Sequence, residues 1–337
     1  MKNLIINLIL CFTLALTNIP TTASTEEFND VKEIVSSTVS TGYDLECTDI
    51  SVKEFLNEQN EVQYYCSFKT TESSGYAIVK NINNDIYVEK LCLENTEYKD
   101  SEYIGSSDFE QHTLTVSYSD KSESSKKLAI NYPAYSFNVS CVPKASACII
   151  GYYDRFHTNL FPNFEPGREY YDYGVYSYTS VTNSYVIAEV DQLAADMGTT
   201  SPAEGVTVNE FKTGFQKFCS RKSLTATYNS CMSNGMFNFN TAKTQLEQYK
   251  PLIIFMSEYN ITTLSSSNNV DTVAMYTSTV PHAMAAFGYE SVTYTLNGQT
   301  RVDNYLHVST GTPSMPTALL NLSYYIDIDD AYAISIA

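Results

Sequence analysis

The 337-residue chain has no tryptophan, only four histidines, and few basic residues. Its 20 lysines and arginines stand against 38 aspartates and glutamates, which gives a net charge of −18. Phosphate backbones and anionic lipid surfaces repel such a chain, so we expect it to bind neither nucleic acid nor membrane surfaces. The cysteines and histidines also lack the spacing of a zinc site, which argues against a metal framework.

Beyond the N-terminus, no apolar run reaches the roughly 20 residues that a membrane-spanning helix needs. The N-terminus itself has Lys2, then an apolar run over 4–16, then small residues that end near Ala23. This layout is typical of a secretory signal peptide, and a membrane anchor is the alternative. The sequence therefore predicts a leader over 1–23 and a secreted or cell-surface protein.

Loss of the leader would remove Cys11 and leave seven of the eight cysteines. An odd number implies at least one thiol without an intramolecular partner. In the oxidising compartment that a leader implies, three disulfides and one free thiol would fit the count. The alternative is that several of these cysteines are buried and reduced.

The length favours two domains after the leader. Residues 24–116 are predicted to form a small β-rich domain, because strand-like runs flank a turn signal at 83–85. Residues 117–130 are rich in Ser, Lys and acidic side chains, which indicates an exposed linker, with Lys126-Lys127 as a processing site. The second domain is then expected over 131–337.

The second domain has the pattern of helices followed by strands. Helices are predicted over about 141–156, 185–197, 208–221 and 241–249. Strand-like runs follow from 251 to 309, and Asn297-Gly298 is a strong hairpin signal. This order predicts an α+β fold with a helical lobe, an antiparallel sheet lobe and a cleft between them.

Cys141 is the candidate nucleophile. It is expected at the amino end of the first of these helices, after Ser140 as N-cap and before Pro143 in the first turn. The aligned peptide dipoles at that end favour the thiolate, the reactive form of the side chain. Cys148 lies two turns deeper on the same face, where we expect it to be buried or bridged.

A thiol nucleophile needs a base, and imidazole titrates nearest to neutral pH. His112 lies in or just after the N-terminal domain, and His157 closes the helix of the nucleophile, so both have structural interpretations. His282 begins an apolar strand, from whose edge the ring can project toward Cys141. His307 is its rival, and residue types alone leave the choice between them open.

Three runs resemble the catalytic domain of bacterial papain-like cysteine peptidases, of the double-glycine (bacteriocin-processing) and streptopain-like groups. The first, CVPKASACIIGYYDRFHTNLFPNFEPG, is similar to C-G-P-T-A…GYYD…G-Y-P-N-L, and EVDQLAADMGTTSPAEGVTVNEFKTGFQKFC is similar to the L-a-x-x-M-G-T…G-F-x-x-G segment. KPLIIFM with HAMAAFGYE is similar to r-P-v-I…G-H-a-v-x-x-x-G-Y. The likeness keeps its order over 131–311 and implies a papain-like two-lobe fold with Cys141 as nucleophile and His282 as base.

The chain departs from the pattern of this family near both of these residues. Val142 and Lys144 stand where members have Gly and Thr. The strand after the histidine lacks the Asn or Asp that holds the ring in members. Ser309 is the first candidate for that role, and Asp303 and Asn304 are the alternatives.

The family's oxyanion-hole Gln has no clear match, and Asn138 is the nearest amide, although it also lies in a glycosylation sequon. With these residues the chain is predicted to be a cysteine peptidase, a thiol hydrolase acting on a peptide or protein substrate without a cofactor. The N-terminal domain would then be a propeptide that inhibits the enzyme intramolecularly, or an accessory domain that is never removed. The rivals are a non-catalytic papain-like binding protein and a Cys-His acyl or amide transferase.

Overall fold

The structure is a computed structural model that describes most of the chain after the predicted leader, whose residues 1–23 lie outside the described part. The described residues are 25–43, 45–56, 62–71, 74–82, 85–93, 110–129, 132–161, 184–312 and 315–337. Among them, no helix combines the length and the apolar character that crossing a membrane requires.

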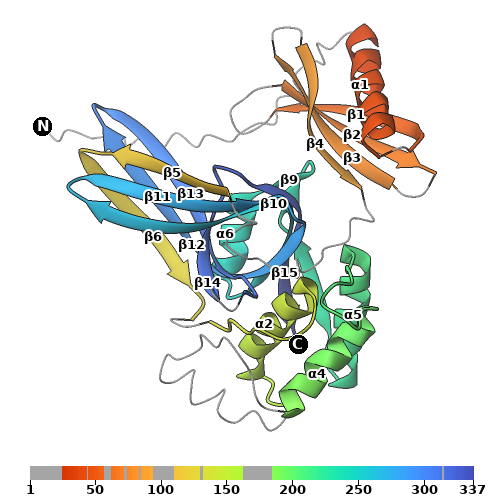
Figure 1. Ribbon diagram of the computed structural model, residues 1–337, viewed down its shortest axis with the longest axis vertical. Helices are drawn as coiled ribbons and strands as arrows, with labels where there is room; N and C mark the ends of the chain where they lie inside the picture. Colours follow the sequence, from red (N-terminus) through yellow and green to blue (C-terminus); the bar gives the residue numbers. More distant parts are fainter. Residues whose placement is uncertain are drawn as a thin grey trace, which may run out of the picture.

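The N-terminal unit is a helix packed on a small antiparallel sheet (Figure 1). Its elements are α1 (Thr25–Tyr43), β1 (Cys47–Leu56), β2 (Val62–Thr70), β3 (Ser74–Ile82) and β4 (Asp85–Leu93). Val31, Val35 and Val39 recur every four residues along α1 and are buried. They pack against the alternate residues Tyr64 and Phe68 of β2, because one helix stripe and one strand face meet. The two predicted strands of this unit are confirmed as β3 and β4.

The second unit is built on a nine-stranded sheet with the order β5-β11-β10-β14-β13-β12-β6, extended by β15 and β7. Its strands are β5 (Glu110–Ser117), β6 (Asp120–Lys127), β7 (Ala226–Ser230), β10 (Leu252–Ser267), β11 (Val270–Ser278), β12 (His282–Leu296), β13 (Gln299–Ser309), β14 (Thr317–Asn321) and β15 (Asp327–Ile336). A separate two-stranded hairpin consists of β8 (Met232–Ser233) and β9 (Met236–Phe237). Every described pairing is antiparallel, which confirms the predicted α+β class.

The predicted linker over 117–130 is wrong for most of its length. Residues 120–127 form β6, which pairs with β12 from Asp120 opposite Thr295 to Lys127 opposite Gly288. The strand before it, β5, also belongs to the large sheet, so the second unit includes residues from Glu110 onward. An edge strand needs no apolar face, and lysines protect it from further pairing, so its composition matches that of a linker. The predicted processing site Lys126-Lys127 lies within this paired strand.

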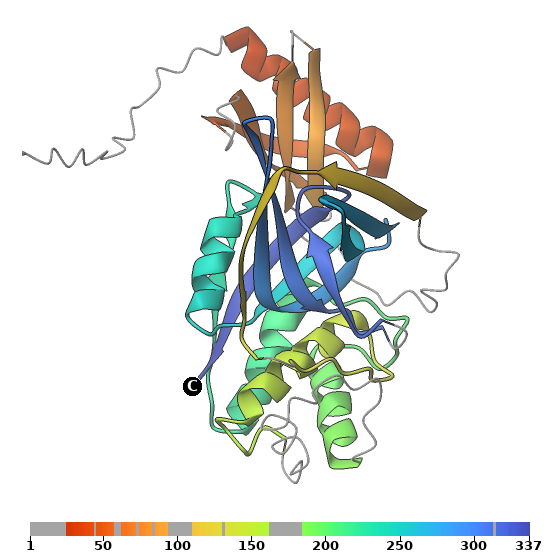
Figure 2. The ribbon, with the colours of Figure 1, turned by 90° about the vertical axis from the view of Figure 1, so that its left-hand side faces the viewer.

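The four predicted helices are confirmed as α2 (Cys141–Asp154), α4 (Ser184–Asp196), α5 (Val208–Arg221) and α6 (Phe239–Glu247). The capping box at the start of α5 is present, because Thr207 accepts from the Glu210 amide and the Glu210 carboxylate accepts from the Thr207 amide. Every residue of α2 is buried, since the helix contacts β12 and β10 of the sheet as well as α4 and α5. Figure 2 shows α2, α4 and α5 grouped at the end of the molecule away from α1, whereas α6 lies beside the large sheet and contacts β12, β15 and β6.

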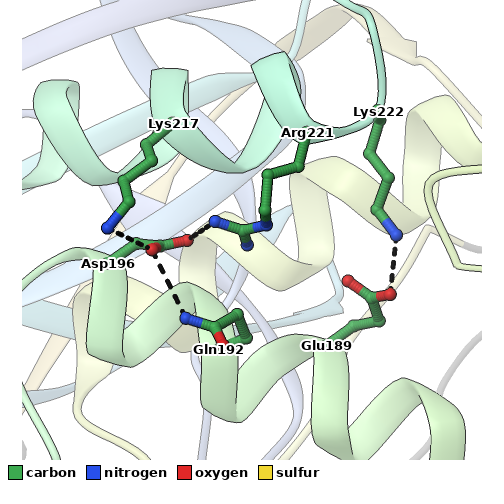
Figure 3. A network of polar contacts seen from close by, with 6 residues as sticks. All are labelled: Glu189, Gln192, Asp196, Lys217, Arg221 and Lys222. Carbon is green, nitrogen blue, oxygen red and sulfur yellow. Dashed lines mark hydrogen bonds and ion pairs between the residues drawn. The ribbon is translucent and has the colours of Figure 1, made fainter.

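An ion-pair network fixes α4 against α5 (Figure 3). The Asp196 side chain is fully buried and accepts from Lys217 Nζ at 2.9 Å and from the Arg221 guanidinium. A second pair joins Lys222 Nζ to Glu189 Oε1 at 2.6 Å. Because α2 also contacts both helices, this network holds the layer that covers α2.

The two units contact each other through a pair of tyrosines. The rings of Tyr65 and Tyr76 are stacked, with centroids 5.6 Å apart, and they meet Gly235 at the turn of the β8–β9 hairpin. The Tyr76 hydroxyl donates to the backbone carbonyl of Asp329 in β15 at 3.0 Å. Side chains of β2 and β3 therefore anchor the N-terminal unit on the second unit.

Candidate functional site

Cys141 is the first residue of α2, as the sequence predicts. The preceding Ser140 has the extended backbone of an N-cap (φ −67°, ψ 168°), and its carbonyl accepts the first helical bond from Lys144 at 3.2 Å. The amides of a first helical turn have no partner within the helix, so this end of α2 stabilises negative charge on the Cys141 sulfur. The residue is only 1% exposed, which places the thiol inside the protein.

His282 is the first residue of β12 and is 2% exposed. Its Nε2 lies 3.0 Å from the carbonyl oxygen of Thr310, and its ring stacks on Tyr259 with centroids 5.1 Å apart. A carbonyl oxygen can only accept, so Nε2 carries the hydrogen and donates it. In the neutral ring Nδ1 then carries the lone pair, which is the form that a general base requires.

Two contacts fix the direction in which α2 runs over the end of β13. Cys148 Sγ lies 3.3 Å from Ser309 Oγ, at the last residue of this strand. One turn earlier in the helix, Lys144 packs on Gly311, where an added Cβ would lie 3.2 Å from Lys144 Cδ. From Cys148 toward its amino end, α2 therefore extends beyond the last residue of β13.

The His282 ring contacts the same turn after β13 that Lys144 contacts. Thr310, between the two contact points, is the residue whose carbonyl accepts from the His282 ring. Cys141 comes three residues before Lys144, at the end of α2 that advances toward this turn. The structure thus brings the amino end of α2 to the end of β12 that carries His282.

The structure places Ser309 differently from the predicted orienting role. Its hydroxyl contacts the thiol of Cys148, whereas the Nε2 atom of His282 is held by the main chain of the next residue, Thr310. Sequence could not reveal this, because every residue has a carbonyl and only the tertiary structure decides which one meets a ring.

The two alternative orienting residues have partners elsewhere on β13. Asp303 accepts from Arg301 through both carboxylate oxygens, at 2.8 and 2.7 Å. Asn304 accepts from the hydroxyl of Ser291 on β12. Six to seven residue steps along the strand, about 20–23 Å, separate them from the turn at Thr310.

Cys148 is fully buried, as predicted, and is present as a free thiol. Burial raises its pKa to about 11, although the Ser309 hydroxyl, the Tyr135 amide and the charge of Lys144 lower it. The thiol therefore stays protonated at neutral pH. Two cysteines on one helix differ in position, and only Cys141 lies at the positive end of the dipole.

The other three histidines lie away from the amino end of α2. His307 is buried opposite Gly288, with Nε2 3.5 Å from Glu290 Oε2. Burial and the Lys127 charge lower the pKa of His307 to about 4. His112 stacks on Tyr325 with centroids 4.1 Å apart, and His157 follows the carboxyl end of α2.

Asn138, the predicted oxyanion donor, is exposed three residues before Cys141. The buried hydroxyl next to Cys141 belongs instead to Ser140, and its Oγ makes no hydrogen bond within the described part of the chain. Residues that sequence reasoning missed are Thr310, Tyr259 and the Lys144–Gly311 contact. Only Gly311 carried a sequence signal, since its φ of +72° favours glycine.

The predicted disulfide framework is not present among the cysteines whose side chains are described. Six of them take part in no disulfide, namely Cys47, Cys66, Cys141, Cys148, Cys219 and Cys231. Burial raises the pKa of Cys66, Cys219 and Cys231 to about 12, so these behave as apolar side chains. The described residues also contain no group of three or more His, Cys, Asp or Glu side chains arranged to hold a metal ion.

In comparisons with known proteins, no protein-family model, no curated protein and no solved structure matches the chain. Function is therefore inferred from the residues of the site.

Proposed function

We propose that this chain is a secreted cysteine peptidase of papain-like fold, with Cys141 as nucleophile and His282 as base. The observation that carries the proposal is the hydrogen bond from His282 Nε2 to the Thr310 carbonyl. In the neutral ring this bond places the hydrogen on Nε2 and the lone pair on Nδ1, and the amino end of α2 advances toward this histidine. Papain-like sites combine such a helix-terminal thiol with an oriented imidazole.

The reaction needs no group beyond the chain and water. The Cys141 sulfur attacks the peptide carbonyl carbon while its proton passes to Nδ1 of His282. The backbone amide of Cys141, in the first turn of α2, is the donor nearest to the developing oxyanion. Nδ1 then returns the proton to the leaving amine as the C–N bond breaks, and water hydrolyses the thioester by the reverse use of the same ring.

The Thr310 carbonyl has a defined role in this reaction. Nε2–H stays bonded to it throughout, because Nδ1 alone exchanges the proton. When Nδ1 is protonated the ring is cationic, and the bond to the carbonyl becomes charge-assisted and stronger. The carbonyl thereby does what the Asn side chain does in the family that the chain resembles.

The two-lobe architecture is part of the proposal. The helices α2, α4 and α5 would form one lobe and the large antiparallel sheet the other. The resemblance over 131–311 and the buried α2 between helices and sheet support this assignment. A leader over 1–23 would direct the protein out of the cell.

We also propose that the N-terminal unit restrains the site intramolecularly. Met256 of β10 pairs with His282 on one side and with Ile328 of β15 on the other. The Tyr76 hydroxyl binds the carbonyl of Asp329, the next residue of β15. Two strand spacings, about 10 Å, therefore separate its docking point from the row that holds His282.

The proposal is tested by alkylating the full chain with iodoacetamide over a pH series and mapping the labelled residues by mass spectrometry. Cys148 is an internal control, because it lies on the same helix and is as buried as Cys141. We expect Cys141 to label between pH 6 and 7 while Cys148 does not, and His282→Ala to remove this advantage. The proposal that Cys141 and His282 act as a pair is contradicted if Cys141 labels no faster than Cys148. It is also contradicted if His282→Ala leaves the labelling rate of Cys141 unchanged.

A second candidate is a non-catalytic binding protein that keeps the same fold. The observation that favours it is the burial of both residues, 1% exposed for Cys141 and 2% for His282. Peptide substrates separate the two functions. Turnover that Cys141→Ala abolishes identifies the peptidase, whereas a reactive pair without turnover on any peptide pool identifies the binding protein.

A further inference from the structure

Lys144 is a buried lysine one turn into the helix of the nucleophile. It is 7% exposed, although lysine is among the residues least often buried. A lysine buried to this extent packs its long aliphatic stem against other groups. The contact that this packing makes lies at the proposed site.

The stem of Lys144 is fitted against Gly311. An added Cβ at Gly311 would lie 3.2 Å from Cδ and 3.7 Å from Cβ of Lys144. Gly311 also has a φ of +72°, where side chains other than glycine are strained. The turn after β13 is thus shaped so that a lysine stem packs directly on its backbone.

The same turn is tied down on its other side by its own hydrogen bonds. Thr310 N donates to the Pro316 carbonyl at 3.1 Å, and Thr312 N donates to Thr310 Oγ1 at 3.0 Å. The Thr310 hydroxyl donates to the Met315 carbonyl. With these bonds on one side and Lys144 on the other, the peptide that follows Thr310 has little freedom to rotate.

We propose that Lys144 is a positioning residue for His282, whose stem holds the Thr310–Gly311 peptide so that the Thr310 carbonyl meets Nε2. The link is short, because Lys144 touches Gly311 and the neighbouring carbonyl lies 3.0 Å from the ring. This inference rests on the proposed peptidase function, since it matters only if the imidazole serves Cys141.

The expected consequence concerns the thiolate–imidazolium pair. A well-placed carbonyl stabilises the cationic ring, and the cationic ring stabilises the Cys141 thiolate. The titratable groups near this chain of contacts include Cys141 and Cys148 on α2 and Tyr259 on β10. If the Thr310 carbonyl is held less firmly, the Cys141 thiolate–His282 imidazolium pair becomes less stable. The thiolate of Cys141 then forms at higher pH.

The experiment uses the full chain labelled with ¹³C at cysteine Cβ, whose chemical shift reports deprotonation of each thiol and needs no reagent to enter the site. Cys141→Ser assigns the signal. Lys144→Ala removes the stem, Lys144→Met keeps an unbranched stem without the charge, and Gly311→Ala disturbs the same contact from the turn side. We expect Lys144→Ala and Gly311→Ala to raise the titration midpoint of Cys141 by about one pH unit, tenfold in thiolate fraction, which is the loss of one charge-assisted bond.

Lys144→Met should stay within about a third of that shift, because its stem still packs on Gly311. Equal shifts for Lys144→Met and Lys144→Ala would overturn the proposal, since the charge and not the stem would then matter. An unchanged midpoint in Lys144→Ala would also overturn it. Failure of the proposed function looks different, because Cys141 in the unmodified chain would then titrate as an ordinary thiol, unaffected by His282→Ala.

Discussion

Replacing Gly235 by alanine should loosen the N-terminal unit from the second unit while leaving both folded. Gly235 lies in the turn of the β8–β9 hairpin, with a φ of +73°. An added Cβ would lie 2.8 Å from Cε2 of Tyr76 and 2.9 Å from Cε2 of Tyr65. Real Cβ atoms do not approach ring carbons so closely, so either the tyrosine rings or the hairpin must move.

The chain contains a matched control for this change. Gly298 follows an asparagine with positive φ in a tight hairpin turn, as Gly235 does, and has a φ of +79°. An added Cβ at Gly298 meets nothing within 4 Å. Backbone strain from alanine should therefore lower the free energy of unfolding by about 1–2 kcal/mol at either position. Only Gly235→Ala adds a loss of about 1–3 kcal/mol from overpacking.

Hydrogen exchange of the full chain, followed by mass spectrometry, separates the two effects. In Gly235→Ala we expect faster exchange in β3 and in the β8–β9 hairpin. The Tyr76 ring would no longer pack on the hairpin, and its hydroxyl would lose the hydrogen bond to the Asp329 carbonyl. In Gly298→Ala we expect faster exchange confined to the ends of β12 and β13. Equal exchange of β3 in the two variants would refute the reasoning, since the tyrosine rings would then not pack on the turn.

Two further predictions concern buried polar residues of the sheet. His307 has a pKa of about 4 in the folded protein against 6.5 as its ordinary value, so the unfolded chain binds the proton first as pH falls. Between pH 7 and pH 5 this lowers the free energy of unfolding by at most about 2 kcal/mol. Urea titrations of His307→Gln should not show this loss of stability. Ser309→Ala removes the contact with Cys148 and should cost about 1 kcal/mol in urea unfolding without changing the alkylation rate of Cys141. A large loss of Cys141 reactivity in Ser309→Ala would instead return Ser309 to the orienting role.

Sequence by itself determined the elements whose signals are local. The capping box at Thr207 and Glu210, the Asn297-Gly298 turn and the helical spacing around Cys148 each act within a few residues, so they predicted α5, the β12–β13 hairpin and α2. The position of Cys141 at the first residue of α2 followed from the same local rules. His282 at the start of β12 was predicted as well, because the apolar run of this strand begins there.

Only the tertiary structure decided what these elements meet. A polar segment such as 120–127 becomes an edge strand because β12 offers it a free row of hydrogen-bonding groups, which its composition does not record. The partner of the His282 ring is a main-chain carbonyl, and a carbonyl has no residue type by which sequence could identify it. Lys144 and Gly311 are 167 positions apart by their numbers, and their contact exists only because α2 packs over the end of β13. Local rules thus placed Cys141 and His282 on their elements, and packing between distant elements decided how the His282 ring is held.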